Sequence, residues 1–169
     1  EYGVDVDLGN DVSKILFNAV RATWKNREGK LGEVVVPTDN FSGLRYVNVS
    51  ELPNGTVMNI GFDGIGTKPY VAEGTCNHRT MAYDLLAMVC DDAVVRGAEP
   101  VLVGSILDVS SLGPKDNPYL EEVRQLAEGY INSARAADVA IVNGEVAELG
   151  ARINGKGNRI KYNWGAGVV

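Results

Sequence analysis

Stretches with apolar residues at helical spacing occur along the chain together with short β-type runs, and this pattern constrains the fold more than any other feature. The helical stretches cover residues 12–24, 78–98 and 117–137. The β-type runs cover residues 33–36, 44–49, 56–62, 101–109, 139–142 and 160–169. Because runs of strands are interleaved with the helices, we expect an α+β fold with a mixed or antiparallel sheet and helices on one face.

Local signals mark the limits of some of these elements. The chain starts with a Gly- and Asp-rich stretch that we expect to be extended, with Asn10 or Asp11 capping the first helix. Pro53, Asn54 and Gly55 are strong turn formers between two β-type runs. Those two runs are therefore predicted to pair as an antiparallel hairpin.

Composition places the chain among globular proteins and argues against several classes of function. Its 169 residues suffice for one domain, and 45% of them are apolar and 22% charged. The net charge of −6, without a basic cluster, argues against nucleic-acid binding. No apolar run approaches the ~20 residues of a membrane span. Cys76 and Cys90 form no metal-type pair, and with no signal peptide in the sequence we expect a cytoplasmic protein.

The most informative segment is a Gly-rich stretch that follows the third β-type run. Gly64 and Gly66 allow the backbone to approach a ligand closely, and Thr67 and Lys68 can donate hydrogen bonds to phosphate oxygens. Asp63, at the end of the run, offers the hard carboxylate oxygens that a divalent cation prefers. The alternative is a Gly-rich hairpin loop with a solvated lysine, because short loops of this composition are common.

Three carboxylates lie on the second predicted helix. Asp84 and Asp91 share one face, and Asp92 is rotated by ~100° from Asp91. Carboxylates among apolar residues cost free energy unless they are paired, and few cations other than Arg96 are close in sequence. A divalent cation is one possible partner. A solvated edge of an amphipathic helix is the alternative.

Polar residues also follow two of the later β-type runs. Asn143, Gly144 and Glu145 come directly after the run 139–142, which we predict to end in a glycine turn. Asp108 lies late in the run before it. The alternatives are a capped turn with an exposed glutamate and a turn-forming aspartate.

Several common sites are excluded by the residues that the chain lacks. His78 is the only histidine, so no histidine metal cage can form, and without a nearby nucleophile it supports no Ser-His or Cys-His triad. This residue is expected simply to begin a helix. The phosphate-binding pattern G-x-x-x-x-G-K-[ST] and the dinucleotide pattern G-x-G-x-x-G are both absent. Four acids together with a Gly-Thr-Lys loop therefore predict a different kind of metal–phosphate site.

Six motifs follow one another along most of the chain, at residues 3–10, 63–68, 78–92, 96–100, 107–108 and 144–145. In this order they resemble the N-terminal domain of the aminoimidazole ribonucleotide synthetase family. The Asp-Gly-Ile-Gly-Thr-Lys and Gly-Ala-Glu-Pro motifs are specific to this family. More loosely, they belong to a superfamily that includes selenophosphate synthetase, thiamine-monophosphate kinase and a hydrogenase maturation factor.

This resemblance implies that residues 1–169 form a domain that binds ATP and Mg²⁺, in a homodimer whose two sheets close into one β-barrel. It also implies a further, C-terminal domain, which agrees with a sequence that starts at Glu1 rather than Met and stops at Val169 inside an apolar run. The implied activity is that of an ATP-dependent cyclo-ligase of purine biosynthesis. Such an enzyme closes the imidazole ring of aminoimidazole ribonucleotide from the small-molecule substrate formylglycinamidine ribonucleotide.

The matching motifs also imply roles for individual residues. Asp63 and Lys68 are the expected catalytic residues. Asp63, Asp92 and Asp108 are the expected metal ligands. The residues expected to bind ATP are Gly64, Gly66, Thr67, Lys68, Asp84, Asn143, Gly144 and Glu145.

The sequence departs from the family pattern at four places. Asp91 stands where the family has Asn, residues 143–146 read Asn-Gly-Glu-Val instead of Gly-Gly-Glu-Thr, and Val109 replaces a Tyr. A Gly-rich stretch is reduced to residues 40–44. Because these changes touch the expected nucleotide site, two alternatives stay open. One is an ATP-dependent enzyme of the superfamily with another substrate, and the other is a catalytically silent module for nucleotide binding and dimerisation.

Overall fold

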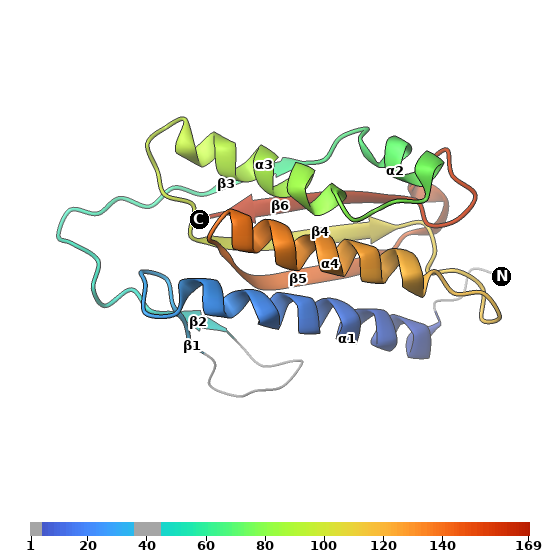
Figure 1. The fold of residues 1–169 in the computed structure, drawn as a ribbon, viewed down its shortest axis with the longest axis horizontal. Helices are drawn as coiled ribbons and strands as arrows, with labels where there is room; N and C mark the ends of the chain where they lie inside the picture. The colour runs from blue at the N-terminus through green and yellow to red at the C-terminus, as the bar shows by residue number, and fades with distance from the viewer. Residues whose placement is uncertain (1–4, 36–44) are drawn as a thin grey trace.

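A computed structural model describes residues 5–35 and 45–169 (Figure 1). Its centre is a four-stranded sheet with the order β3-β6-β4-β5. These strands are β3 (Gly61–Gly64), β4 (Leu102–Val109), β5 (Ala140–Glu148) and β6 (Tyr162–Val168). β6 is antiparallel to both β3 and β4, whereas β4 and β5 are parallel. A second, two-stranded sheet pairs β1 (Val34–Val35) with β2 (Tyr46–Val47).

Three long helices lie across one face of the four-stranded sheet (Figure 1). These long helices are α1 (Val6–Thr23), α3 (Met81–Val94) and α4 (Leu120–Ala136). The chain also forms a short helix, α2 (Pro69–Thr75), and the 3₁₀ helices η1 (Trp24–Arg27) and η2 (Gly150–Arg152). The short α2 follows β3, and α1, α3 and α4 form the layer over the sheet. The prediction of an α+β fold with a mixed sheet and helices on one face is confirmed.

The strands alternate between a packed face and an open face. Val103, Leu107 and Trp164 point toward the helices and are at most 2% exposed. On the other face, Ile106 is 55% and Phe62 is 73% exposed. This alternation is what period-2 geometry produces when helices cover only one side of a sheet. No described element of the chain covers the open face.

The first helix begins earlier than the sequence suggested. Asp5 is its N-cap, because the Asp5 carboxylate accepts hydrogen bonds from the backbone N–H groups of Asp7 and Leu8, each at 3.1 Å. The prediction that Asn10 or Asp11 caps this helix is wrong, since both lie within α1. The carboxylate of Asp5 accepts from the unpaired amides of the first turn, and residues 6–11 are therefore helical rather than extended.

The predicted hairpin does not form, although its turn does. The amide of Thr56 donates to the carbonyl of Pro53 at 3.1 Å, as expected for a turn. However, β2 pairs with β1, and β3 pairs with β6, which lies about a hundred residues further along the chain. Long-range pairing thus overrides the local turn signal.

Two further boundaries differ from the prediction. The loop after β3 leads directly into α2, with Pro69 at the first helical position, where the missing N–H of proline costs nothing. β5 continues to Glu148, so residues 143–145 lie inside this strand and not in a turn after it. The register between β4 and β5 shifts between Val103 and Gly104, and this irregularity accommodates one additional residue of β5, Val142.

Candidate functional site

The Gly-rich loop after β3 is fixed at its base by a buried anchor. Ile65 is 1% exposed, and its amide donates to the carbonyl of Trp164 at 3.0 Å. The Asp63 carboxylate accepts a 2.7 Å hydrogen bond from the amide of Gly64. Gly66 has φ +58°, a left-handed conformation that favours glycine. The backbone of this loop is therefore held in one shape while its outer part stays open.

Lys68 lies at the end of this loop, where α2 begins. Its ammonium nitrogen is 4.0 Å from a carboxylate oxygen of Asp84, which comes from the first turn of α3. The two side chains are 42% and 34% exposed, so the pair adds little to stability. The fold thus brings together two of the residues that the sequence indicated, in a place that solvent and ligands can reach.

The other predicted metal ligands lie apart from this pair. Asp92 forms an exposed ion pair with Arg96 at 3.6 Å near the end of α3. Asp108 belongs to the open face of the sheet, because it is in register with Asn163 of β6 and follows the buried Leu107. Within residues 5–35 and 45–169, no three His, Cys, Asp or Glu side chains are close enough to hold a metal together.

This arrangement bears on how Mg²⁺ could bind. Mg²⁺ usually keeps several waters and takes one or two carboxylates together with phosphate oxygens of a substrate. The described residues offer single carboxylates but no complete protein cage. Asp63, Asp92 and Asp108 therefore stay predicted metal ligands, each of which would supply a single carboxylate beside water and phosphate oxygens.

Asn143, Gly144 and Glu145 lie at the opposite edge of the sheet from the Gly-rich loop. β3 and β5 are the two edge strands, with β6 and β4 between them. Three inter-strand spacings correspond to roughly 14 Å. The two predicted halves of the ATP site are therefore not in direct contact, but both border one hollow of about 830 Å³ on the open face of the sheet, which Asp63, Gly64 and residues 143–145 line.

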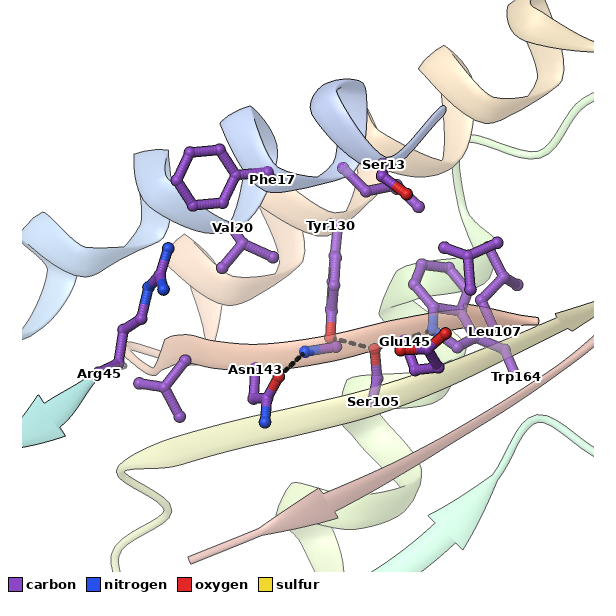
Figure 2. A pocket seen from close by; sticks show the side chains of 14 residues that line it. Ser13, Phe17, Val20, Arg45, Ser105, Leu107, Tyr130, Asn143, Glu145 and Trp164 are labelled. Atoms are coloured by element: carbon purple, nitrogen blue, oxygen red, sulfur yellow. Dashed lines mark hydrogen bonds between the residues drawn. The ribbon is translucent and has the colours of Figure 1, made fainter. Parts of the chain in front are cut away.

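The strand β5 also borders a cavity of about 490 Å³ on the helix-covered side (Figure 2). Its floor is a buried hydrogen-bonded group in which Ser105 Oγ accepts from the Tyr130 hydroxyl at 2.8 Å and from Trp164 Nε1 at 3.2 Å. At its rim, the Arg45 guanidinium lies 5.1 Å from the ring centre of Phe17. The lining of this cavity comes from five elements, α1, β4, α4, β5 and β6, together with Arg45. Only its β5 residues belong to a sequence motif, so the sequence did not indicate the cavity.

A second polar cluster was also missed, and it is buried under the loop between β5 and β6. One Glu73 oxygen accepts from the amides of Lys156 and Gly157 at 2.7 and 3.1 Å, and Glu122 is hydrogen-bonded to Arg159. Burial lowers the pKa of His78, although the nearby Glu122 and Glu73 oppose this effect. Glu73, Glu122 and Arg159 are far apart in the sequence, so no local pattern of residues identifies this cluster.

The single histidine has a structural environment. His78 is 2% exposed and precedes α3, as expected for a residue near a helix start. Its Nδ1 atom is 2.9 Å from the Tyr162 hydroxyl, and its backbone amide donates to Gln125 Oε1 at 2.9 Å. Of the two cysteines, Cys90 is buried and burial raises its pKa to about 11, which makes it unreactive. Cys76, which follows α2, is exposed.

Comparisons with known proteins identify the family. Residues 46–168 match the family described as AIR synthase related protein, N-terminal domain. The phosphoribosylformylglycinamidine cyclo-ligase of Geobacter metallireducens is 35% identical over 147 residues, which are 87% of this chain and 38% of that protein. The enzyme of the same name from Geotalea uraniireducens is 33% identical, with the same coverage. The chain thus spans about two fifths of the length of these curated relatives.

Solved structures give weaker likenesses. The Escherichia coli hydrogenase maturation protein HypE has a TM-score of 0.46 at 16% identity, covering 64% of this chain and 30% of that one. Thiamine monophosphate kinase from Aquifex aeolicus has a TM-score of 0.41 at 12% identity, covering 86% and 40%. A HypE structure in complex with ATP has a TM-score of 0.44 at 14% identity, covering 69% and 33%. On the sequence match of residues 46–168 and on its relatives, the chain belongs to the AIR synthase-related family and corresponds to the N-terminal domain of that family.

Proposed function

We propose that the protein to which this chain belongs is a cytoplasmic, ATP-dependent cyclo-ligase that converts formylglycinamidine ribonucleotide to aminoimidazole ribonucleotide in purine biosynthesis. The observation that carries this proposal is the anchored Gly-Thr-Lys loop, with Lys68 placed 4.0 Å from Asp84 in an accessible position. The names of relatives that are about one third identical supply the reaction. Because the chain spans only part of these relatives, the remaining part of the protein would provide most contacts to the substrate.

In the proposed reaction, the formyl-amide oxygen of the substrate attacks the γ-phosphorus of ATP, and the bond to ADP breaks. The amidine nitrogen then attacks the activated carbon, and inorganic phosphate leaves as the ring closes. Lys68 would neutralise the charge that develops on the phosphoryl oxygens, with Thr67 and the backbone amides of Gly64 and Gly66 orienting them. Mg²⁺ would add further charge neutralisation when bound with ATP. We propose Asp63, Asp92 and Asp108 as its candidate ligands, and Asp84 as one of the residues that bind ATP.

The proposal includes a homodimer. The open face of the sheet carries Phe62 and Ile106, which are 73% and 55% exposed, and solvated apolar residues on a bare sheet favour association. A second copy related by a two-fold axis would cover this face with the same surface and could close a barrel. It would also explain how motifs at the two edges of one sheet, near Lys68 and Asn143, can serve one nucleotide.

Two other functions remain candidates. Asn143 and Val146 stand where the resembled family has Gly and Thr, and this favours a superfamily enzyme that uses ATP on another substrate as the first alternative. A module that binds nucleotide without turnover is the second. A panel of acceptor substrates separates these three functions. The cyclo-ligase should release ADP with formylglycinamidine ribonucleotide, the other superfamily enzyme with a different acceptor, and the silent module with none.

The test uses the full-length gene product in an ADP-release assay. We expect ADP and phosphate to form only when formylglycinamidine ribonucleotide is present. We expect the Lys68→Ala variant to lower kcat/KM by about 10²–10³-fold, as the loss of one charge-stabilising group does elsewhere, and Lys115→Ala, at a lysine that is 88% exposed, to have no effect. Turnover with another acceptor and none with formylglycinamidine ribonucleotide would refute the cyclo-ligase.

A companion measurement addresses the metal. Mg²⁺ together with a non-hydrolysable ATP analogue should raise the melting temperature of the protein, since a ligand that binds only the folded state stabilises it. Asp63→Asn and Asp92→Asn are expected to remove the Mg²⁺-dependent part of this shift. An unchanged shift in both variants would exclude these two residues as ligands.

A further inference from the structure

Residues 155–159, which we call the strap, lie in the loop between β5 and β6 and pack directly against the short helix α2 (Figure 1). A Cβ atom added at Gly157 would lie 2.9 Å from Glu73 Cβ and 3.4 Å from the Glu73 carbonyl oxygen. A Cβ atom added at Gly155 would lie 2.6 Å from Glu73 Oε1 and closer still to Oε2. The two glycines therefore allow the strap to lie closer to α2 than residues with a side chain could.

Glu73 fastens the strap to α2. The residues that this helix buries are Pro69, Ala72 and Glu73, and the polar one, Glu73, is 6% exposed. Its Oε2 atom accepts hydrogen bonds from the backbone amides of Lys156 and Gly157 at 2.7 and 3.1 Å. A buried carboxylate is unfavourable unless it is hydrogen-bonded, and the strap supplies these donors. The side chain of Glu73 and the backbone of the strap thus depend on each other.

The other end of the strap is fastened to the long helix α4. Arg159 Nη2 donates to Glu122 Oε2 at 3.3 Å, and the Arg159 guanidinium lies 4.7 Å from the ring centre of Tyr119, which precedes α4. Glu122 is 6% exposed, so this contact is part of the packed protein. Through Glu73 and the strap, α2 is therefore tied to the layer of helices that covers the sheet.

The position of α2 decides where Lys68 lies, because Lys68 is the N-cap of this helix. The amides of Tyr70 and Val71 donate to the carbonyls of Thr67 and Lys68 at 3.1 and 3.0 Å, so the Gly-rich loop continues into the helix without a break. α2 has only 7 residues, and a helix of this length is not stable without contacts to the rest of the protein. Contacts such as that of Glu73 therefore determine how firmly the helix is held.

We propose that Glu73 is a positioning residue for Lys68. By holding α2 to the strap, Glu73 keeps the Lys68 ammonium group where it can neutralise the phosphoryl group that is transferred. This role rests on the proposed function, which supplies the task of Lys68. The exposed ion pair with Asp84, at 4.0 Å, holds the lysine only weakly. A displacement of ~1 Å at a catalytic group can cost about 100-fold in rate, so a loosened α2 should slow the reaction.

The hydrogen bonds of Glu73 predict which substitution is tolerated. Its Oε2 atom accepts both strap amides, whereas its buried Oε1 atom has no partner among the residues that the structure describes. A glutamine oxygen can accept the same two amides. Glu73→Gln should therefore keep kcat within about threefold of wild type. Glu73→Ala should lower kcat by about 10–100-fold and leave KM for the acceptor nearly unchanged, because the loss is confined to the transition state.

A second variant breaks the same contact from the side of the strap. Gly155→Ala places a methyl group against the Glu73 carboxylate, which is the end of a flexible side chain and can turn away without disrupting the fold. It should lower kcat as Glu73→Ala does. Two controls lie on α2 itself, Val71→Ala at a side chain that is 67% exposed and Gly74→Ala, where an added Cβ meets no atom within 4 Å. Both controls should react like wild type.

The double variant with Lys68→Ala separates positioning from a general loss of structure. If Glu73 acts through Lys68, Glu73→Ala should not lower kcat further once Lys68 is alanine. A further loss of about tenfold or more in the double variant would show that Glu73 supports the protein as a whole, and the positioning role would be refuted. It would also be refuted if Glu73→Ala left kcat unchanged, or if Glu73→Gln lost as much activity as Glu73→Ala.

These measurements, made on the full-length protein in the ADP-release assay, keep the positioning role apart from the proposed function. If Lys68→Ala slows the reaction and Glu73→Ala does not, the proposed function stands and the positioning role is refuted. If the protein uses another acceptor, the same variants are compared with that acceptor, and only the cyclo-ligase is refuted. If it turns over nothing, the affinity for a non-hydrolysable ATP analogue replaces kcat, and Glu73→Ala should again have no effect in the Lys68→Ala background.

Discussion

The two faces of the four-stranded sheet are made by the same strands but differ in how they are completed. On the covered face, α1, α3 and α4 bury side chains such as Leu107 and Trp164 to 2% exposure or less. On the open face, Ile106 and Phe62 remain more than half exposed. The covered face therefore holds the fold of a single chain together, whereas the apolar residues of the open face can contribute fully only when something else covers them.

The largest expected effect tests how tightly the covered face is packed. A Cβ atom at Gly129, in α4, would lie 2.2 Å from the backbone carbonyl oxygen of Arg79. Because backbone cannot move aside as a flexible side chain can, Gly129→Ala should lower the free energy of unfolding by about 3 kcal/mol, at the upper end of overpacking costs. Chemical denaturation measures this change.

The matched control is another helical glycine. Gly74, in α2, has no atom within 4 Å of an added Cβ. Gly74→Ala should raise stability by about 0.5–1 kcal/mol, because alanine has the better helix propensity. If Gly129→Ala were neutral, the close contact between α4 and Arg79 would not exist in solution.

The open face is tested through assembly. If a second copy covers it, Ile106→Lys should raise the dimer dissociation constant by about 100-fold or more, since burying an unpaired charge in an apolar interface is costly. Sedimentation at micromolar concentration checks this, and the wild-type dimer should persist in 1 M salt because an apolar interface does not depend on screened charges.

Val6→Lys serves as the control for this experiment. Val6 is 68% exposed but lies at the start of α1, away from the open face. This variant should dimerise normally. A monodisperse wild-type monomer would contradict the homodimer and would leave the open face as a surface that another part of the protein covers.

The sequence predicted the covered face better than the edges of the sheet. The helical spacing in α3 and α4 and the apolar run of β4 are strong periodic signals, because each element must bury one side. The pairing of β3 with β6 is not visible locally, since the partners are about a hundred residues apart. Gly144 indicated a turn, yet an edge strand tolerates glycine, and β5 continues through it.

The candidate site divides in the same way. Asp63 to Lys68 form a contiguous motif, so the loop and its lysine could be found from the sequence, and Asp84 proved to be its neighbour. The cavity above Ser105 depends on residues from five separate elements that only folding brings together. Asp63 and Asp108 border the same hollow on the open face, although they are 45 residues apart in the sequence, whereas Asp92 borders another one. The local sequence offers no pattern for such long-range neighbours.

A smaller effect is expected from the buried polar group of the covered face. Tyr130→Phe removes the 2.8 Å hydrogen bond to Ser105 while keeping the ring against Trp164. The free energy of unfolding should fall by about 1 kcal/mol, the usual value for one buried hydrogen bond. Tyr83→Phe, at a side chain that is 46% exposed, should change it by less than about 0.5 kcal/mol. Equal effects would show that the floor hydrogen bond adds nothing to stability.

The smallest expected effect is a pH dependence that comes from the end of the covered face. Burial alone would raise the pKa of Glu122, but the hydrogen bond and charge of Arg159 outweigh it and hold this pKa below its ordinary value of 4.5. A carboxyl whose pKa is lower in the folded state stabilises the protein above the unfolded pKa, and this contribution is lost as the pH falls through the folded value. Stability should therefore decline below about pH 4.5, and Glu122→Gln should remove part of that decline.

The Arg159 side chain is 37% exposed, so the difference in the free energy of unfolding between wild type and variant should stay below about 1 kcal/mol. Denaturation curves between pH 3 and pH 6 measure it, and identical pH profiles for wild type and variant would show that the ion pair is fully screened by solvent.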